Sequence, residues 1–237
     1  MRKIALIVVA VFFTILNLYA RNISYETSGF KMLLDDKGYI VSIFDKQNNT
    51  EYLSDTRIAP LLSIRINNII ECPSQLKQSN NVLTLFFSNN KVEARVKAIT
   101  KPGYLSFELI GISKPEIIEL VIWGPYPTTI SETIGECVGV VRNKQFALGI
   151  QSLNVKTLGG YPSDENDIEP SFDILTKGNV TDELADWKKK KSYRGQTARV
   201  QDFGSVLQAY CRNRNKEVSF PTGPMNFMLL LHLMTGV

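Results

Sequence analysis

Short runs of alternating apolar and polar residues, separated by turn-forming residues, constrain the fold of this chain more than any other feature. The clearest pair covers residues 30–34 and 39–44, with Asp35-Asp36-Lys37-Gly38 between them. A period of two places alternate side chains on opposite faces of a strand, and Asp and Gly favour the turn that joins two strands. This pattern predicts antiparallel β-hairpins.

The same pattern recurs about every ten residues, which is typical of a β-sandwich. We therefore predict an all-β fold, a two-sheet antiparallel β-sandwich that occupies residues 21–220. The sequence contains no glycine-rich phosphate loop, no heptads and no repeat of fixed period, which excludes those architectures. The predicted strands cover residues 30–34, 39–44, 61–66, 82–88, 92–99, 104–111, 117–123, 137–142, 146–152 and 204–211.

Residues 160–200 interrupt this rhythm with a polar stretch rich in Asp, Glu and Lys. Within it, Thr181-Asp182-Glu183 predicts the start of one short helix that runs through Lys190. Acidic residues at the start and lysines at the end suit the helix dipole. We interpret the stretch as a polar excursion from the sandwich, with disorder as the alternative.

The first twenty residues have the layout of a secretory signal peptide. Arg2 and Lys3 precede an apolar run over residues 4–15, and Ala20 supplies a small residue at the expected cleavage point. The apolar run is shorter than the roughly 20 residues that span a membrane. We predict a signal peptide at 1–20, export to the periplasm or the cell surface, and no membrane contact after cleavage. An uncleaved anchor is the alternative.

Composition excludes several functional classes. The net charge of +4 falls by two when Arg2 and Lys3 leave with the signal, so there is no electrostatic case for nucleic acid as a partner. His232 is the only histidine, and no GxSxG motif is present, so a histidine-activated serine or cysteine nucleophile is not predicted. We predict no catalytic residues, no cofactor and no metal site in this chain.

The three cysteines give no sign of zinc or redox chemistry. Cys72, Cys137 and Cys211 form no CxxC pair and have no histidine close by in the sequence. In an oxidising compartment the chain could hold one disulfide and one thiol, or three buried thiols. Both alternatives stay open at this point.

Flat aromatic side chains are the candidates for carbohydrate binding, because the C–H face of a pyranose is apolar. Trp123 and Tyr126 flank Gly124-Pro125, which we interpret as a turn at a strand end. Tyr161 and Trp187 lie in polar, loop-like surroundings. We predict a carbohydrate-binding platform from Trp123, Tyr126, Tyr161 and Trp187. The alternative is that Trp123 closes the sandwich core and the tyrosines pack at its rim.

Two groups of carboxylates invite a functional interpretation, and in both cases the plain one is preferred. Glu132 and Glu136 are four residues apart, as a glycosidase pair could be, but this spacing is common. The acidic run over residues 164–169 offers oxygen ligands for Ca²⁺, but it departs from the EF-hand pattern at Ile168. We predict ordinary surface residues at both places.

Residues 221–237 form an apolar tail without strand alternation. Back-translation of this tail, read two bases later, gives Glu-Phe-Tyr-Ala-Ala-Ala-Ser-Phe-Asp-Asp-Gly-Gly, which looks like an acidic, glycine-rich loop. The hypothesis is that a frameshift truncates the reading frame and that the native protein continues. A downstream frame that never realigns with this one would contradict the hypothesis.

The segment from Gly29 to Lys46, GFKMLLDDKGYIVSIFDK, resembles the opening hairpin of galactose mutarotase-like sandwich domains, and residues 47–53 continue the pattern. The stretch from Trp123-Gly124-Pro125-Tyr126-Pro127 to residue 162 is similar to the front domain of large glycan-degrading proteins from gut bacteria. Such domains precede the catalytic domains of many secreted bacterial glycoside hydrolases and polysaccharide lyases. No catalytic residue of these families maps onto this chain.

This resemblance implies a non-catalytic N-terminal domain of an exported carbohydrate-active enzyme, truncated before its catalytic domain. Its partner would be a glycan or that missing domain of the same polypeptide. One alternative is a stand-alone glycan-binding module at the cell surface. Another is an adhesion module without affinity for sugars.

Overall fold

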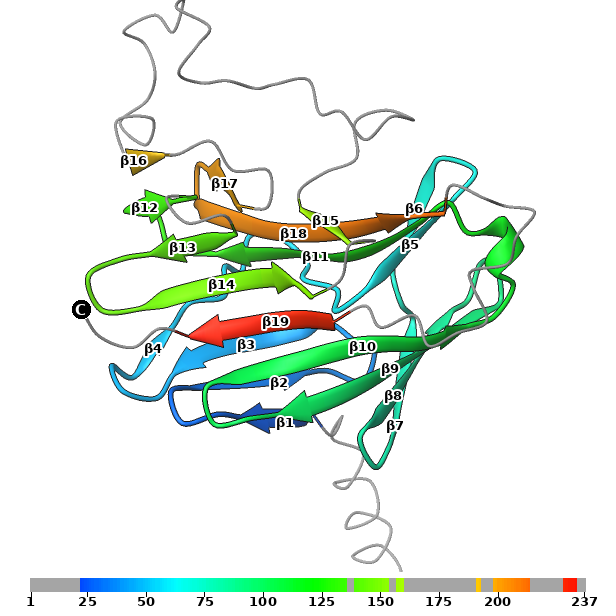
Figure 1. Cartoon of the computed structure of the whole chain (residues 1–237), viewed down its shortest axis with the longest axis horizontal. Coiled ribbons are helices and arrows are strands. Elements are labelled where there is room, and N and C mark those ends of the chain that lie inside the picture. The colour runs from blue at the N-terminus through cyan, green and yellow to red at the C-terminus, as the bar shows by residue number, and fades with distance from the viewer. Residues whose placement is uncertain are drawn as a thin grey trace, which may run out of the picture.

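The computed structural model describes residues 22–135, 139–153, 157–159, 191–192, 198–213 and 228–233. These residues form an all-β structure, as the sequence predicts (Figure 1). Among them the only helical element is a 3₁₀ turn, η1 (Pro115–Ile117). The predicted helix over residues 181–190 lies outside the described residues.

The strands form three sheets. The four-stranded sheet has the order β1-β2-β3-β4, the nine-stranded sheet β16-β12-β13-β14-β19-β10-β9-β8-β7, and the six-stranded sheet β15-β18-β11-β5-β6, with β17 paired to β18. The bounds of the first two sheets are β1 (Ile23–Glu26), β2 (Phe30–Leu34), β3 (Ile40–Asp45), β4 (Thr50–Glu51), β16 (Lys191–Ser192), β12 (Thr133–Ile134), β13 (Val140–Arg142), β14 (Ala147–Ser152), β19 (Met228–Leu233), β10 (Tyr104–Ile112), β9 (Val92–Thr100), β8 (Val82–Phe87) and β7 (Gln75–Ser79). The six-stranded sheet contains β15 (Leu158–Gly159), β18 (Gly204–Arg212), β11 (Leu120–Thr128), β5 (Ser63–Ile66), β6 (Ile69–Glu71) and β17 (Ala198–Gln201).

Two layers result, because the two smaller sheets are joined edge to edge. Isolated bridges connect Tyr39 to Pro60 and Leu53 to Thr128. The nine-stranded sheet packs against this combined layer, and the Tyr25 ring meets the Phe107 ring edge-on at 5.8 Å across the interface. One continuous apolar core draws buried side chains from all three sheets. The predicted β-sandwich is therefore confirmed, with three sheets in two layers instead of two sheets.

Alternation in the sequence becomes alternation in burial. The residues of β2 alternate between buried and half-buried, and those of β9 alternate over most of its length. Phe30, Met32 and Leu34 are all fully buried and face the core. Burial of apolar area at about 25 cal/mol per Å² is the main force that holds such a face inward.

Turns between the first strands are built from their own side chains. Asp35 Oδ1 accepts hydrogen bonds from the backbone N–H groups of Lys37, Gly38 and Tyr39 at 2.8–3.0 Å. Gly38 has φ +96°, a backbone conformation that L side chains rarely adopt, so the turn needs glycine. The hairpin between β2 and β3 is thus specified locally, which explains why the sequence predicts it well.

The sequence pattern did not predict several of the observed strands. The β5–β6 hairpin turns at Asn67 and Asn68, with φ of 49° and 61°, the left-handed values of a two-residue hairpin loop. The strands β1, β6 and β7 lie at sheet edges, where one-sided exposure weakens the alternation. Short strands of two to four residues, such as β4 and β12, offer too few positions to show a period.

Within the apolar tail, residues 228–233 form strand β19. This strand lies between β10 and β14, so it has a strand on both sides. The missing alternation does not argue against a strand, because a short apolar run of about four to eight residues is also consistent with a strand in the core of a sandwich. The frameshift hypothesis itself stays a prediction.

Candidate functional site

The segment Trp123-Gly124-Pro125-Tyr126, singled out by the sequence, lies in the middle of β11. It forms a β-bulge, because the register with β18 shifts between Trp123 and Tyr126. Gly124 has φ +97°, and a Cβ there would lie 3.0 Å from both the Leu207 carbonyl oxygen and the Tyr126 nitrogen. The Gly124–Pro125 peptide bond is cis. The interpretation of this segment as a turn that ends a strand is therefore wrong: the strand continues to Thr128 through a bulge that accommodates proline.

Two long-range hydrogen bonds hold the bulge in place. The Ser63 hydroxyl donates to the Gly124 carbonyl oxygen at 3.1 Å, and the Tyr126 hydroxyl donates to the Leu61 carbonyl oxygen at 2.7 Å. Burial raises the pKa of Tyr126 well above its ordinary value, so this phenol stays a neutral donor. Both bonds reach from β11 to the segment that includes β5.

The same geometry removes both aromatic rings from solvent. Trp123 is 0% exposed and Tyr126 is 1% exposed, and both belong to the main core. The Trp123 Nε1 atom is buried without a hydrogen-bond partner. In the described structure neither ring offers a face on which a sugar could stack, so the placement of Trp123 and Tyr126 on a surface platform is wrong. Their burial agrees with the alternative that Trp123 closes the core.

The remaining sequence candidates are not brought together by the described residues. Tyr161, Trp187, Glu136 and the acidic run over residues 164–169 lie outside them. Glu132 is exposed, next to the short strand β12. A carbohydrate site that uses Tyr161 and Trp187 therefore stays a prediction.

Glu71 and Glu51 each accept hydrogen bonds from backbone N–H groups of other residues. Glu71 is only 5% exposed, and its oxygens accept from the Asn89 N–H at 2.7 Å and the Asn90 side-chain amide at 2.6 Å. Glu51 accepts from the N–H groups of Ile43 and Leu53 at 2.7 and 2.8 Å. These acceptors are used to fix turns and strand ends, which is a structural role.

The Arg65–Glu119 pair is the most enclosed ion pair among the described residues. Arg65 Nε lies 3.0 Å from Glu119 Oε2, which also accepts the Asn68 N–H at 3.1 Å. The pair therefore ties the β5–β6 turn to the start of β11. Both side chains are partly enclosed, so solvent screens this contact less than the exposed Glu26 pairs.

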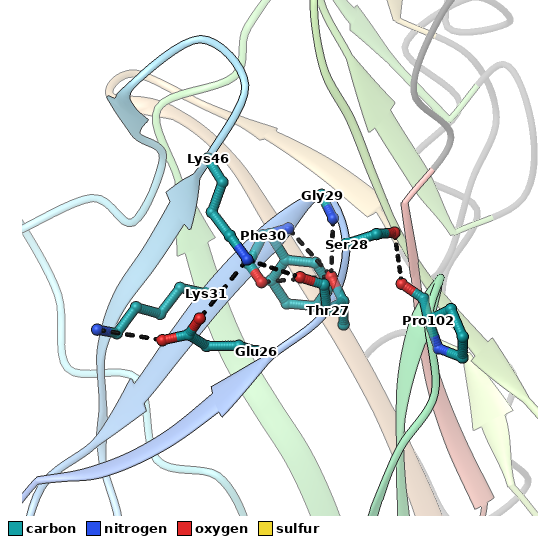
Figure 2. A network of polar contacts seen from close by, with 8 residues as sticks. All are labelled: Glu26, Thr27, Ser28, Gly29, Phe30, Lys31, Lys46 and Pro102. Atoms are coloured by element: carbon teal, nitrogen blue, oxygen red, sulfur yellow. Dashed lines mark hydrogen bonds and ion pairs between the residues drawn. The ribbon is translucent and has the colours of Figure 1, made fainter.

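A second polar network surrounds the β1–β2 turn and connects it to the β9–β10 turn of the nine-stranded sheet (Figure 2). Glu26 pairs with Lys31 at 3.4 Å and with Lys46 at 3.5 Å. A hydrogen bond from Lys31 lowers the pKa of Glu26, with further attraction from Lys46. Ser28 donates from both its hydroxyl and its N–H to the Pro102 carbonyl oxygen, at 2.6 and 2.8 Å. This link joins the β1–β2 turn to the β9–β10 turn.

In the described part of the chain, the cysteines, the possible metal ligands and the helical segment form no functional centre. Cys72 is a half-buried thiol whose pKa is raised by burial, and the Tyr39 hydroxyl beside it has a pKa raised to about 12, mainly by burial. No group of three or more His, Cys, Asp or Glu residues there could hold a metal ion. No helix there has the length and apolar composition needed to cross a bilayer. Cys137 lies outside the described residues.

Sequence reasoning did not single out Phe203, an aromatic residue at the surface. Phe203 is half-exposed in the β17–β18 turn, and the Arg57 guanidinium carbon lies 5.6 Å from its ring centre. Ile58, next to Arg57, is 62% exposed. The sequence feature that could have identified Phe203 is its position between Asp202 and Gly204, because turn-forming residues on both sides predict a turn at the surface.

Comparisons with known proteins identify no family for this chain. No protein-family model and no curated protein matches the chain. Among solved structures, a galactose mutarotase-like protein from Lactobacillus casei ATCC 334 matches with 16% identity and a TM-score of 0.30. The match covers 60% of this chain and 59% of that structure, less than two thirds of its length. The fold description therefore rests on the strands of this chain.

Proposed function

We propose that this chain is the non-catalytic N-terminal β-sandwich domain of an exported carbohydrate-active protein, truncated before its catalytic domain. Its role is to brace that domain. The observation that carries the proposal is the structural use of enclosed carboxylates. Glu71 and Glu119 hold loops in place, and the rings of Trp123 and Tyr126 form part of the core. The signal-like residues 1–20 support export.

The bracing role is supported by exposed apolar side chains at the edge of the six-stranded sheet. Ile69 is 70% exposed and Ile70 is 59% exposed, and both lie in the edge strand β6. The β5–β6 hairpin extends beyond the layers at the upper right of Figure 1. Because Ile69 and Ile70 are consecutive, their side chains lie on opposite faces of β6, one on each side of the unpaired strand edge. An edge flanked in this way is a feature of a surface that another domain covers.

An activity assay on the isolated chain tests the non-catalytic part of the proposal. The purified chain is incubated with a panel of plant, fungal and bacterial polysaccharides, and new reducing ends and unsaturated ends are measured. We expect neither above the level of a heat-denatured sample. Turnover that persists through repeated purification would overturn the proposal and call for a catalytic site in the chain.

Sequencing the gene through codon 225 and about a kilobase beyond tests the truncation. A shifted frame that continues into a large domain supports it. A double substitution, Ile69→Thr with Ile70→Thr, tests the surface, since it should reduce self-association of the isolated chain without a loss of thermal stability. The matched control is Ile64→Thr, which replaces a fully buried isoleucine and should destabilise the fold.

A second candidate function, a stand-alone glycan-binding module, is favoured by the Arg57–Phe203 pair on the surface. A ligand that binds only the folded state raises the melting temperature, so a glycan should stabilise the chain. Phe203→Ala, Tyr161→Ala and Trp187→Ala each test whether that shift depends on the substituted ring. An adhesion module without sugar affinity would show no shift with any glycan.

A further inference from the structure

The nine-stranded sheet consists of two groups of strands that meet at β19. One group is β16-β12-β13-β14 and the other is β10-β9-β8-β7. In the described residues, β19 alone connects the two groups through strand pairing. Figure 1 shows β19, in red, between β14 and β10. Continuity of the largest sheet therefore depends on a six-residue segment far from both groups in the sequence.

The two strands next to β19 form a slot with a defined register. On one side Tyr104 is opposite His232 and Glu108 is opposite Met228; on the other side Leu148 is opposite Leu233. Both pairings are antiparallel, so β10 and β14 run parallel to each other, two strand spacings or about 9.6 Å apart. Without a strand between them, each would present a row of unpaired N–H and C=O groups, which is a template for another strand.

The connection to β19 is long. Residues 214–227 join the last described residue after β18 to the first residue of β19. A chain of about 14 residues spans at most about 50 Å when extended. That length allows β19 to reach the slot of its own chain or the slot of a neighbouring copy. An exchanged strand makes the same backbone hydrogen bonds in either place, which is why strand exchange is a low-cost route to dimers.

We propose that the slot between β10 and β14 is a strand-acceptor site whose partner is Met228–Leu233 of a second copy of this chain. The same site holds β19 of its own chain in the monomer. Two copies that exchange these segments form a dimer with both slots filled. This inference rests on the sheet topology of the chain with Met228–Leu233 in place. It does not depend on the non-catalytic role, whereas a frameshift before residue 228 would replace the strand that it describes.

Cross-linking between two single variants tests the proposal directly. Ser106 is opposite Leu230 in the register, and directly opposite residues of an antiparallel pair have Cα atoms about 4.5–5.5 Å apart, within the range of roughly 4.4–6.8 Å that a disulfide spans. Ser106→Cys changes one atom, and the Ser106 hydroxyl has no hydrogen-bond partner to lose. One chain carries Ser106→Cys and the other Leu230→Cys. The two are mixed in denaturant, refolded together at high concentration, oxidised, and separated without reductant.

We expect a covalent heterodimer in the mixture at a yield at least five times that of either variant refolded alone. The single-variant samples account for the native cysteines. Thr84→Cys mixed with Leu230→Cys is the matched control, because Thr84 lies on β8, separated from β19 by β9 and β10. The proposal is overturned if the heterodimer yield does not exceed that of the single variants, or if the Thr84 mixture gives the same yield.

A measurement on the unmodified chain guards against a failure of the variants to fold. Refolding at high concentration should give a dimer fraction on size-exclusion chromatography that persists after dilution. Complete unfolding followed by refolding at low concentration should convert it to monomer. A chain that refolds only to monomer at every concentration contradicts strand exchange.

Discussion

The β2–β3 hairpin and the β11 bulge are two motifs that the sequence singles out, and the structure holds them by opposite means. In the hairpin, Asp35 fixes the turn through hydrogen bonds to residues two to four positions away. In the bulge, Ser63 and Leu61 hold Gly124 and Tyr126 from 61 and 65 positions away. Local contacts can be predicted from a sequence window, whereas the partners of the bulge are chosen by the fold.

This comparison makes the bulge the more sensitive of the two regions. Its two aromatic side chains are fully buried, so their removal leaves cavities or unpaired groups in the core. The hairpin turn is partly exposed, so water can replace what a substitution removes. The predictions that follow test this difference, from the largest effect to the smallest.

Trp123→Ala should give the largest effect, a loss of about 3–5 kcal/mol in the free energy of unfolding, because it leaves a cavity beneath the bulge. Trp123→Phe is the matched control. It keeps an aromatic ring and loses no hydrogen bond, since Nε1 has no partner, so its cost should be clearly smaller. Urea denaturation measures both. Equal and small effects would mean that Trp123 is not part of the core.

Tyr126→Phe should lower the free energy of unfolding by about 1–3 kcal/mol, because the Leu61 carbonyl oxygen loses its buried donor. The change leaves ring packing intact, so the loss reports the long-range hydrogen bond alone. A thermal melt or urea titration at neutral pH measures it. A neutral result would show that water reaches the Leu61 carbonyl oxygen and that the bulge is less enclosed than its burial indicates.

Asp35→Ala should cost about 1 kcal/mol, since three N–H groups lose one acceptor in a turn that water can reach. Asp35→Asn keeps the Oδ1 acceptor and is the control, with a smaller loss. Hydrogen exchange should place the effect in residues 35–40. A loss as large as that of Trp123→Ala would contradict the distinction between the two regions.

Tyr25→Phe should change stability at pH 7 by less than about 0.5 kcal/mol, because the Tyr25 hydroxyl is buried without a partner. Burial raises the pKa of Tyr25 to about 12, above its value of about 10 in the unfolded chain. The neutral phenol is therefore favoured in the folded state. This contribution is complete below pH 10 and is lost as the pH rises from 10 to 12.

The pH dependence gives this last prediction its control. Urea titrations at pH 7, 10 and 12 should show that the native chain loses about 2–3 kcal/mol more than Tyr25→Phe over the alkaline range. Other titrating groups act on both proteins alike and cancel in the difference. Parallel losses in the two proteins would show that the phenol is solvated.

The candidate site shows the same difference between local and long-range contacts: sequence analysis identified residue types but not the contacts that depend on distant strands. Sequence analysis singled out Trp123 and Tyr126 but placed them at the surface, where the structure buries them. The reason is that Gly-Pro indicates a turn when the neighbouring strands are unknown. The pairings of β11 with β5 and β18 keep the strand running past Pro125. The Arg57–Phe203 pair was missed because its members are about 150 positions apart and meet only in the fold.

The sequence by itself determined the all-β class, the positions of most strands of six or more residues and the turn chemistry of the β2–β3 hairpin. These properties follow from the two-residue period of a strand and from the local hydrogen bonds of Asp, Asn and Gly. Tertiary structure alone decided that Trp123 and Tyr126 face the core and that residues 228–233 join β10 to β14. Both depend on which strands become neighbours, and that choice is made by long-range pairing and burial, which no local window contains.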